Sequence, residues 1–141
     1  MRILALDVGT RRIGVAISDE SALIAQPLAY IDVNRVNPVN EIARLCRENQ
    51  VQTVVIGLPL SMSGGDRGIS SRRARALGAV LTDKVKLHVE YVDERFTTAE
   101  ADRVLIAGNV SREKRKENID KLAASLILQH WLDRQASQNR Q

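Results

Sequence analysis

The chain has 141 residues, 44% of them hydrophobic, which is enough to bury a core, so we expect one domain over residues 1–141 that folds without disulfides or structural metals. Its 21 Lys and Arg against 17 Asp and Glu leave a net charge of +4, too small a bias to define a partner by itself. The single cysteine, Cys46, excludes an internal disulfide and lies in an apolar helical pattern, which favours a core position over a nucleophile. Asp7 interrupts the first apolar run, so we expect neither a signal peptide nor a membrane span and place the protein in the cytoplasm.

Two aliphatic runs within residues 3–18 flank a short turn rich in Gly, Thr and Arg. This pattern predicts two strands joined tightly, with Asp7 where the first strand ends. An Asp before a turn can simply hydrogen-bond the turn amides, because Asp is a turn former. Gly9 and Gly14 favour a functional interpretation, since residues without a Cβ let a phosphate or a metal approach the backbone. Both interpretations of Asp7 stay open at this point.

The next three elements follow from local signals. Residues 28–32 predict a third short strand that completes an antiparallel meander. Asn37 followed by Pro38 is a helix start signal, and the apolar face of that helix runs to about residue 50. Residues 51–58 are continuously apolar at their centre, as expected for a parallel strand buried on both faces.

The second half of the predicted sheet begins with a loop. Residues 59–68 contain Ser, Gly and Asp and follow a parallel strand, where open α/β sheets place their ligand crevice, so they form a candidate lid. A helix is expected over residues 69–81 and a fifth strand over residues 85–92. That strand delivers the acids and the arginine of residues 93–95, and a capping box then starts a helix over residues 97–107.

The C-terminal part is expected to combine a charged connection with a long helix. Residues 108–117 are polar and strongly charged, which predicts a segment that is mobile in the free protein and ordered by substrate. The last helix is expected over residues 118–134, with a frayed tail at about 135–141. Asp120 falls at the edge of the buried stripe, where a carboxylate needs a metal or a donor. The predicted stripe comprises Ile119, Leu122, Ala123, Leu126, Ile127, His130 and Trp131, and His130 is interpreted as a packed or partly exposed histidine rather than a ligand.

Positive charges cluster along the chain, and most of them are arginines. Arg forks suit phosphate oxygens, so the clusters indicate a phosphate-rich partner such as nucleic acid, although solvated helix faces explain them equally well. With so few aromatic residues we expect backbone phosphates to be gripped and no single-strand stacking platform. The clusters are Arg11 with Arg12; Arg67 with Arg72, Arg73 and Arg75; and Arg112, Lys114, Arg115, Lys116 and Lys121, and the aromatic residues are Tyr30, Tyr91, Phe96 and Trp131.

Three carboxylates stand at the ends of predicted elements: Asp7, Glu94 and Asp120. If the two strands are neighbours and the last helix packs across them, all three meet at one edge of the sheet. Such a cluster suits Mg²⁺, and two such ions roughly 3.5–4 Å apart can activate a water and stabilise the leaving oxygen of a phosphodiester. His88 and His130 are isolated in the sequence, so there is no zinc-ligand spacing.

Four motifs, in order, resemble those of the YqgF family, Holliday-junction-resolvase-like nucleases that mature the 5′ end of pre-16S ribosomal RNA. They are Leu-Asp-Val-Gly-Thr-Arg-Arg-Ile-Gly-Val-Ala at residues 6–16, Val-Ile-Gly-Leu-Pro-Leu at 55–60, Asp-Glu-Arg-Phe-Thr-Thr-Ala-Glu-Ala at 93–101 and Ile-Asp-Lys-Leu-Ala-Ala at 119–124. The resemblance covers nearly the whole chain. Phe96 stands where the family often has Leu, for which we expect only a packing change, and the loop at residues 63–66 varies among relatives.

The resemblance implies an α/β, ribonuclease H-like fold, with a five-stranded mixed sheet flanked by helices. It also implies that Asp7, Glu94 and Asp120 are the catalytic, metal-binding acids, with Mg²⁺ or Mn²⁺ as the cofactor. The expected partner is a ribosomal RNA precursor or branched DNA, bound by a monomer or a homodimer. The residues expected to contact nucleic acid are Thr10, Arg11, Arg12, Arg72, Arg73, Arg75, Arg95, Arg115 and Lys116.

Other classes of protein share parts of this pattern. Asp-x-Gly-Thr before a second strand also resembles the phosphate-binding hairpin of sugar kinases and actin-like ATPases. Those proteins close two such domains around ATP, and 141 residues build only one. A Holliday junction resolvase acting on branched DNA and a nucleic-acid-binding module without catalysis are the remaining alternatives, and metal-dependent cleavage that requires Glu94 would separate a nuclease from the latter.

Overall fold

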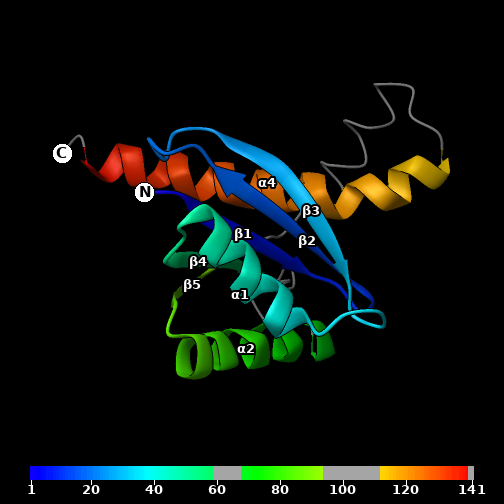
Figure 1. Ribbon diagram of the computed structural model, residues 1–141. Helices are drawn as coiled ribbons and strands as arrows, with labels where there is room; N and C mark the ends of the chain where they lie inside the picture. Colours follow the sequence, from blue (N-terminus) through cyan, green and yellow to red (C-terminus); the bar gives the residue numbers. More distant parts are fainter. Residues whose placement is uncertain (59–67, 94–111, 140–141) are drawn as a thin grey trace.

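A five-stranded mixed sheet forms the centre of the protein (Figure 1). The structure is a computed structural model that describes residues 1–58, 68–93 and 112–139, with the backbone alone for 112–121 and 139. The strand order is β3-β2-β1-β4-β5, in which β1 pairs antiparallel with β2 and parallel with β4. The strands are β1 (Ile3–Val8), β2 (Arg12–Ser18), β3 (Ala25–Asp32), β4 (Thr53–Leu58) and β5 (His88–Asp93). The predicted meander and the parallel central strand are confirmed, and β3 begins three residues earlier than expected.

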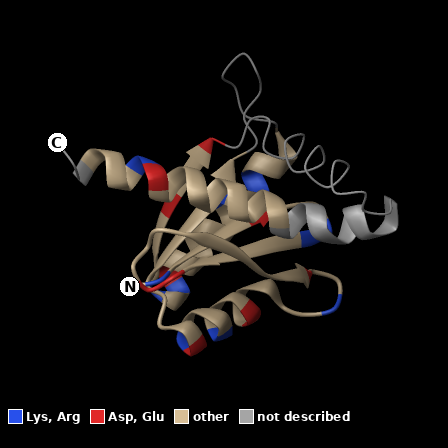
Figure 2. Ribbon diagram, turned by 90° about the horizontal axis from the view of Figure 1, so that it is seen from above, with Lys and Arg blue, Asp and Glu red and all other residues tan. Residues whose placement is uncertain are grey.

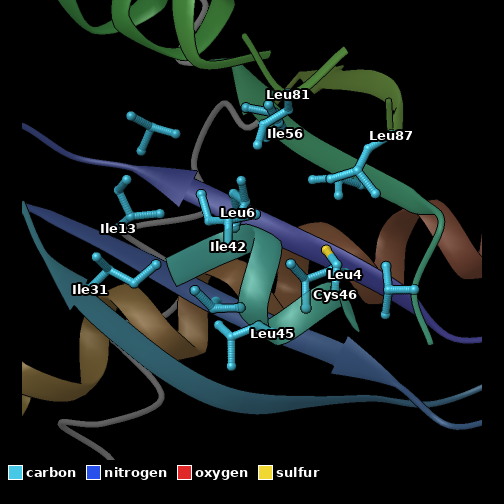
Figure 3. Packing of buried hydrophobic residues seen from close by; sticks show 14 of the residues in the cluster. Leu4, Leu6, Ile13, Ile31, Ile42, Leu45, Cys46, Ile56, Leu81 and Leu87 are labelled. Atoms are coloured by element: carbon cyan, nitrogen blue, oxygen red, sulfur yellow. The ribbon is translucent and has the colours of Figure 1, made fainter. Parts of the chain in front are cut away.

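Helices cover both faces of the sheet. On one face, α1 (Pro38–Asn49) and α2 (Ile69–Val80) pack on side chains of β1, β2 and β4, as Figure 3 shows for Leu6 beside Ile42. On the other face, α4 (Arg112–Asn139) lies across β1, β2, β3 and β4. We call these two sides the α1/α2 face and the α4 face. None of the helices in the described ranges is long and apolar enough to cross a membrane.

The geometry of the β1–β2 turn explains why position 9 is a glycine. The Gly9 amide donates a hydrogen bond to the Arg12 carbonyl oxygen at 2.9 Å. A Cβ at position 9 would lie 2.7 Å from that same oxygen, closer than side chains and backbone normally approach. Gly9 is therefore required by the turn itself, because the backbone has no room for a side chain there.

The first helix begins and ends where its sequence signals predict. The Asn37 side chain accepts a hydrogen bond from the Asn40 amide at 3.1 Å, and Pro38 occupies the first helical position. Gln50 ends the helix in the left-handed conformation, with φ at 57°. The buried side chains Ile42, Leu45 and Cys46 hold the helix on the sheet.

Burial makes Cys46 a pH-dependent stabilising group. Desolvation raises the pKa of its thiol from 9.0 to about 11, so between these values the folded protein keeps a proton that the unfolded chain loses. We therefore expect the free energy of unfolding to fall as the pH rises from 9 to 11. Cys46→Ala should flatten this part of the profile, measured by urea unfolding at several pH values. Equal slopes in both proteins would show that the thiol contributes nothing.

One boundary expected in the second half of the sheet is wrong, the start of the strand predicted over residues 85–92. Residues 81–85 form a π-helical turn, η1 (Leu81–Val85), and β5 starts at His88, not at Val85. The turn ends with Lys86 at φ 65°, and the Leu87 amide donates to the Leu81 carbonyl at 3.1 Å. Val85 at the end of this turn and Leu87 after it both pack on the core, so residues 85–87 precede β5 instead of belonging to it.

The C-terminal helix is longer than predicted at both ends. Residues 112–117, expected to be mobile, are helical, and the helix continues through Asn139 where a frayed tail was expected. Arg, Lys, Glu, Gln and Ala are good helix formers, so these polar stretches extend a helix that the packed centre already nucleates. Residues 108–111 lie outside the described part of the chain.

The buried stripe of α4 is wider than a single helical row. Ala124, Ser125, Leu128 and Leu132 are buried in addition to the predicted Ala123 and Ile127. Leu122, Leu126 and Trp131 are half-buried, and Trp131 still packs against the cluster beneath α4. His130 is exposed, which corrects its predicted place in the stripe. A helix lying across four strands is covered on its flanks as well as its centre, so a narrow apolar row underestimates the contact.

Candidate active site

Asp7 is a buried carboxylate on the α4 face of the central strand. Asp7 is only 8% exposed, and every other residue of its strand, β1, is apolar. In β1 the side chains of Ile3 and Ala5 belong to the cluster beneath α4, whereas Leu4 and Leu6 belong to the opposite cluster. Because side chains alternate along a strand, Asp7 lies on the α4 face.

Glycines flank Asp7 in both neighbouring strands. In β2 its direct ladder partner is Gly14. In β4, Leu6 pairs with Ile56, which puts Gly57 level with Asp7, and Val55 on the α4 face puts Gly57 on that face too. Neither adjacent strand therefore contributes a side chain at the level of the carboxylate. A glycine within a strand is typical of a close approach by a ligand or another backbone.

The structure describes the side chain of only one of the three predicted acids. Glu94 lies outside the described residues, and Asp120 is described by its backbone alone, in the first third of α4. The predicted Arg95 also lies outside, and Arg115 and Lys116 are likewise known only as backbone positions of α4. Within the described residues, no group of at least three His, Cys, Asp or Glu side chains could hold a metal ion. The three-acid cluster therefore stays a prediction.

Several of the predicted phosphate-binding residues meet at the β1–β2 turn. Arg73 of α2 donates a hydrogen bond from Nη1 to the Thr10 carbonyl at 2.8 Å, so one helix arginine holds the turn. Arg11 lies 3.8 Å from a carboxylate oxygen of Asp32, with 65% of its side chain exposed. The Arg12 guanidinium lies over the Tyr30 ring, 6.0 Å from its centroid.

The other arginines of α2 are not gathered at this turn. Arg75 lies over the Tyr91 ring of β5, 5.5 Å from its centroid, and Arg72 is exposed. Figure 2 shows positions with Lys or Arg interspersed with positions with Asp or Glu along the described ribbon. Of the described arginines predicted to contact phosphates, Arg11 and Arg12 therefore lie at the hairpin that follows Asp7, with Arg73 in contact with it, whereas Arg75 lies against β5.

Comparison with protein families assigns the chain to a known family. The family model described as "RuvX: Holliday junction resolvase" matches residues 1–134, almost the whole chain. The chain belongs to the RuvX family. The resemblance found in the four sequence motifs is thus confirmed, with Asp7 and both of its flanking glycines inside the matched region.

Relatives from several bacteria align with this chain over nearly their full lengths. A protein of Lactococcus lactis subsp. cremoris (strain MG1363) named "Putative pre-16S rRNA nuclease" is 46% identical over 138 residues, which cover 96% of each chain. A protein of the same name from Halalkalibacterium halodurans is also 46% identical, with 96% of this chain and 98% of the relative covered. Another from Clostridium botulinum (strain Alaska E43 / Type E3) is 42% identical, with 95% and 98% covered.

Solved structures of resolvases share the RuvX fold. Thermus thermophilus RuvC in complex with a Holliday junction substrate superposes with a TM-score of 0.56 at 15% identity, covering 96% of each chain. The fowlpox virus Holliday junction resolvase gives a TM-score of 0.54 at 15% identity, covering 94% of this chain and 99% of the other. This likeness confirms the ribonuclease H-like architecture that the motifs implied.

Two residues level with Asp7 were not singled out from the sequence. Gly57 sits in a run of apolar residues, and a glycine inside a strand is a signal that could have drawn attention to it. Tyr30 is 44% exposed and shares a ladder level with Gly14 and Asp7, a relation that exists only once the strand register is known.

Proposed function

We propose that the protein is a metal-dependent endonuclease that hydrolyses phosphodiester bonds and processes the 5′ end of pre-16S ribosomal RNA. The observation that carries the proposal is Asp7, a buried carboxylate on the α4 face with Gly14 and Gly57 beside it. Membership of the RuvX family supports phosphodiester hydrolysis, and the names of the relatives support the ribosomal RNA precursor as substrate. We expect it to act in the cytoplasm, as a monomer or a homodimer.

The strand register supports a place for Glu94 near Asp7. Glu94 follows Asp93, the last residue of β5, and Val92 belongs to the cluster on the α4 face. Strand alternation therefore predicts the α4 face for position 94 as well. Gly57 pairs with Val92 and is level with Asp7, so the end of β5 and Asp7 lie at the same edge of the sheet.

The path of α4 supports a place for Asp120 above Asp7. Contacts at the start of β1 place Gln129 of α4 at that end of the sheet. Gln129 Oε1 accepts a hydrogen bond from the Ala25 amide at 2.9 Å, and Ala25 pairs with Ser18. The Ser18 hydroxyl in turn accepts a hydrogen bond from the amide of Ile3, the first residue of β1, at 2.8 Å. Helix α4 runs antiparallel to β1 from this end (Figure 1). Nine helical residues back to position 120 span about 13.5 Å, and four strand residues from Ile3 to Asp7 span about 13 Å. Position 120 therefore reaches the level of Asp7.

Asp7, Glu94 and Asp120 would hold Mg²⁺ or Mn²⁺, because carboxylate oxygens are the donors that such cations prefer. A bound divalent ion supplies an activated water and stabilises negative charge at the phosphate. Hydrolysis adds water across one P–O bond: the water oxygen joins phosphorus, and the sugar oxygen leaves with a proton. Asp7 contributes a carboxylate whose position is fixed by the central strand, so little reorganisation is needed when substrate binds.

A second candidate substrate is branched DNA. The family is described as a Holliday junction resolvase, and a RuvC structure shares the fold. Metal-assisted hydrolysis acts on the phosphodiester and does not require a particular sugar. Cleavage of both substrates by the same acids is therefore chemically consistent.

One side-by-side assay tests the proposal. The purified protein is incubated with a pre-16S ribosomal RNA fragment and with a four-way DNA junction, each with Mg²⁺, with Mn²⁺ and with EDTA. We expect metal-dependent cleavage of the RNA near its mature 5′ end. Cleavage of the junction alone would favour the second candidate, and metal-dependent cleavage of neither, with binding retained, would favour a module without catalysis.

Neutralising an exposed arginine of α2 should weaken nucleic-acid binding without changing its sequence preference. Arg72→Ala should lower affinity about equally for different sequences and make the logarithmic salt dependence shallower by roughly one unit, as expected for one lost phosphate contact. Arg47→Ala is the matched control, because Arg47 is exposed in the last turn of α1, at the other end of the sheet. An unchanged slope for Arg72→Ala would remove Arg72 from the interface.

A further inference from the structure

A hollow of about 490 Å³ opens beside the β1–β2 turn, at the edge of the sheet formed by β3. Its volume is within the range of roughly 300–1,000 Å³ that is typical of small-ligand sites. Three arginines and one tyrosine contribute to its wall: Arg11, Arg12, Arg35 and Tyr30. The chemistry of this wall differs from that of an apolar pocket, because it combines guanidinium groups with one aromatic ring.

The charges in the hollow favour an anion. Asp32 lies between Arg11 and Arg35, at 3.8 Å and 3.7 Å from their Nε atoms, and its side chain is only 17% exposed. The second acid of the wall, Glu41, is already bound to Arg44 of α1. The side chains of Arg11 and Arg35 are 65% and 82% exposed, so both guanidinium groups can reach a phosphate in solvent.

The aromatic ring in the hollow favours a base. Tyr30 is 44% exposed on an edge strand, with the Arg12 guanidinium 6.0 Å from its ring centroid. An exposed tyrosine ring stacks on any unpaired base, because every base has a π-face. A base in a duplex cannot reach the ring in this way, since its own faces are covered by its neighbours.

The position of the ring relates the hollow to the candidate active site. Tyr30 pairs with Gly14, and Gly14 pairs with Asp7, so the three residues share one ladder level and one face of the sheet. Two strand spacings separate Tyr30 from Asp7, about 10 Å. Gly14 has no side chain that could stand between them.

We propose that this hollow binds an unpaired nucleotide next to the cleaved phosphodiester. Its base stacks on Tyr30, and its flanking phosphates contact Arg11 and Arg35. The inference rests on the proposed nuclease function and specifies its substrate as a strand with a single-stranded segment at the cleavage site. It revises, for the single ring of Tyr30, the expectation that the protein has no single-strand stacking platform.

Binding without cleavage tests this inference. In EDTA, fluorescence anisotropy compares a blunt RNA hairpin with the same hairpin carrying a single-stranded extension. The wild type should prefer the extended RNA, Tyr30→Ala should lose about 10-fold in affinity for it while its affinity for the blunt RNA stays the same, and Tyr30→Phe should keep the preference. Tyr91→Ala is the matched control, because Tyr91 is 38% exposed under Arg75 on the opposite edge strand. Thermal melts of all four proteins establish that they are folded.

A second variant tests the phosphate contacts and is expected to strengthen binding, in contrast to Tyr30→Ala. Asp32→Asn removes the carboxylate shared by Arg11 and Arg35 but keeps an acceptor for the Asn34 amide, which lies 3.0 Å from Asp32 Oδ1. We expect tighter binding of the extended RNA, by several-fold, and a steeper salt dependence. Equal affinity of the wild type for both hairpins, or no effect of Tyr30→Ala and Asp32→Asn, overturns the inference even if cleavage is observed. A preference that depends on Tyr30 in a protein that cleaves nothing overturns the proposed activity and leaves the hollow as a binding site.

Discussion

Asp7→Asn should abolish metal-dependent cleavage, with a loss of about 1,000-fold or more. Replacing the carboxylate by an amide removes one negative ligand from the predicted metal site, and several kcal/mol of transition-state stabilisation are at stake there. The change is nearly isosteric, so packing between Gly14 and Gly57 is preserved. Single-turnover cleavage of the RNA precursor at saturating protein measures the effect without interference from binding.

The same variant should be as stable as the wild type, or more stable, in metal-free buffer. Two further acids at the same edge would repel the Asp7 carboxylate, and its replacement by an amide would relieve that repulsion. Thermal melts in EDTA test this expectation. Asp83→Asn serves as the control, since Asp83 is exposed in η1, and it should change neither cleavage nor melting. A large loss of stability in Asp7→Asn would identify Asp7 as a structural turn residue.

The parts of the fold that follow from neighbouring residues could be predicted from the sequence. The hairpin around Gly9 and the capped start of α1 at Asn37 depend on contacts within a few positions, and the structure has both. The alternation of side chains along β1, which puts Asp7 and Leu6 on opposite faces of the sheet, is likewise a local property of a strand. Local patterns also predict the antiparallel meander and the parallel central strand, and the family motifs then imply a ribonuclease H-like fold with five strands in one mixed sheet.

The features that could not be predicted depend on long-range packing or on register. Residues 85–87 alternate in polarity like the start of a strand, yet Val85 ends the π-helical turn Leu81–Val85 and β5 starts only at His88, a boundary that depends on how this turn packs on the core. The charged start of α4 lacks apolar residues, so its helicity depends on the packed turns that follow. Tyr30 and Gly57 acquire a role only because two strand ladders bring them level with Asp7.

Helix α4 covers the face of the sheet on which Asp7 lies. From the sequence, Asp7 could simply have been a turn-forming residue. The glycines paired with it in the adjacent strands favour a functional role instead, because they leave no neighbouring side chain at the level of Asp7. The face that remains is closed by α4, which carries position 120. The docking of α4 therefore connects the stability of the fold to the assembly of the proposed site.

Leu128→Ala tests this connection and should be strongly destabilising. Leu128 is fully buried between α4 and the sheet, in the cluster that contains Ile3 and Ala5 of β1. Truncating such a leucine costs about 2–5 kcal/mol, from lost burial and the cavity left behind. Leu23→Ala is the matched control: Leu23 is 59% exposed, so its truncation should cost less than about 0.5 kcal/mol. Urea unfolding of both variants measures the difference.

Cleavage by Leu128→Ala should fall even at temperatures where the protein is still folded. If α4 carries the third acid to Asp7, a looser helix weakens the metal site before the sheet unfolds, because the β1, β2 and β4 core on the α1/α2 face does not include Leu128. The metal concentration needed for half-maximal cleavage should therefore rise, and excess Mg²⁺ should restore part of the rate. Unchanged metal dependence in a clearly destabilised variant would show that α4 is a structural cover without a part in the site.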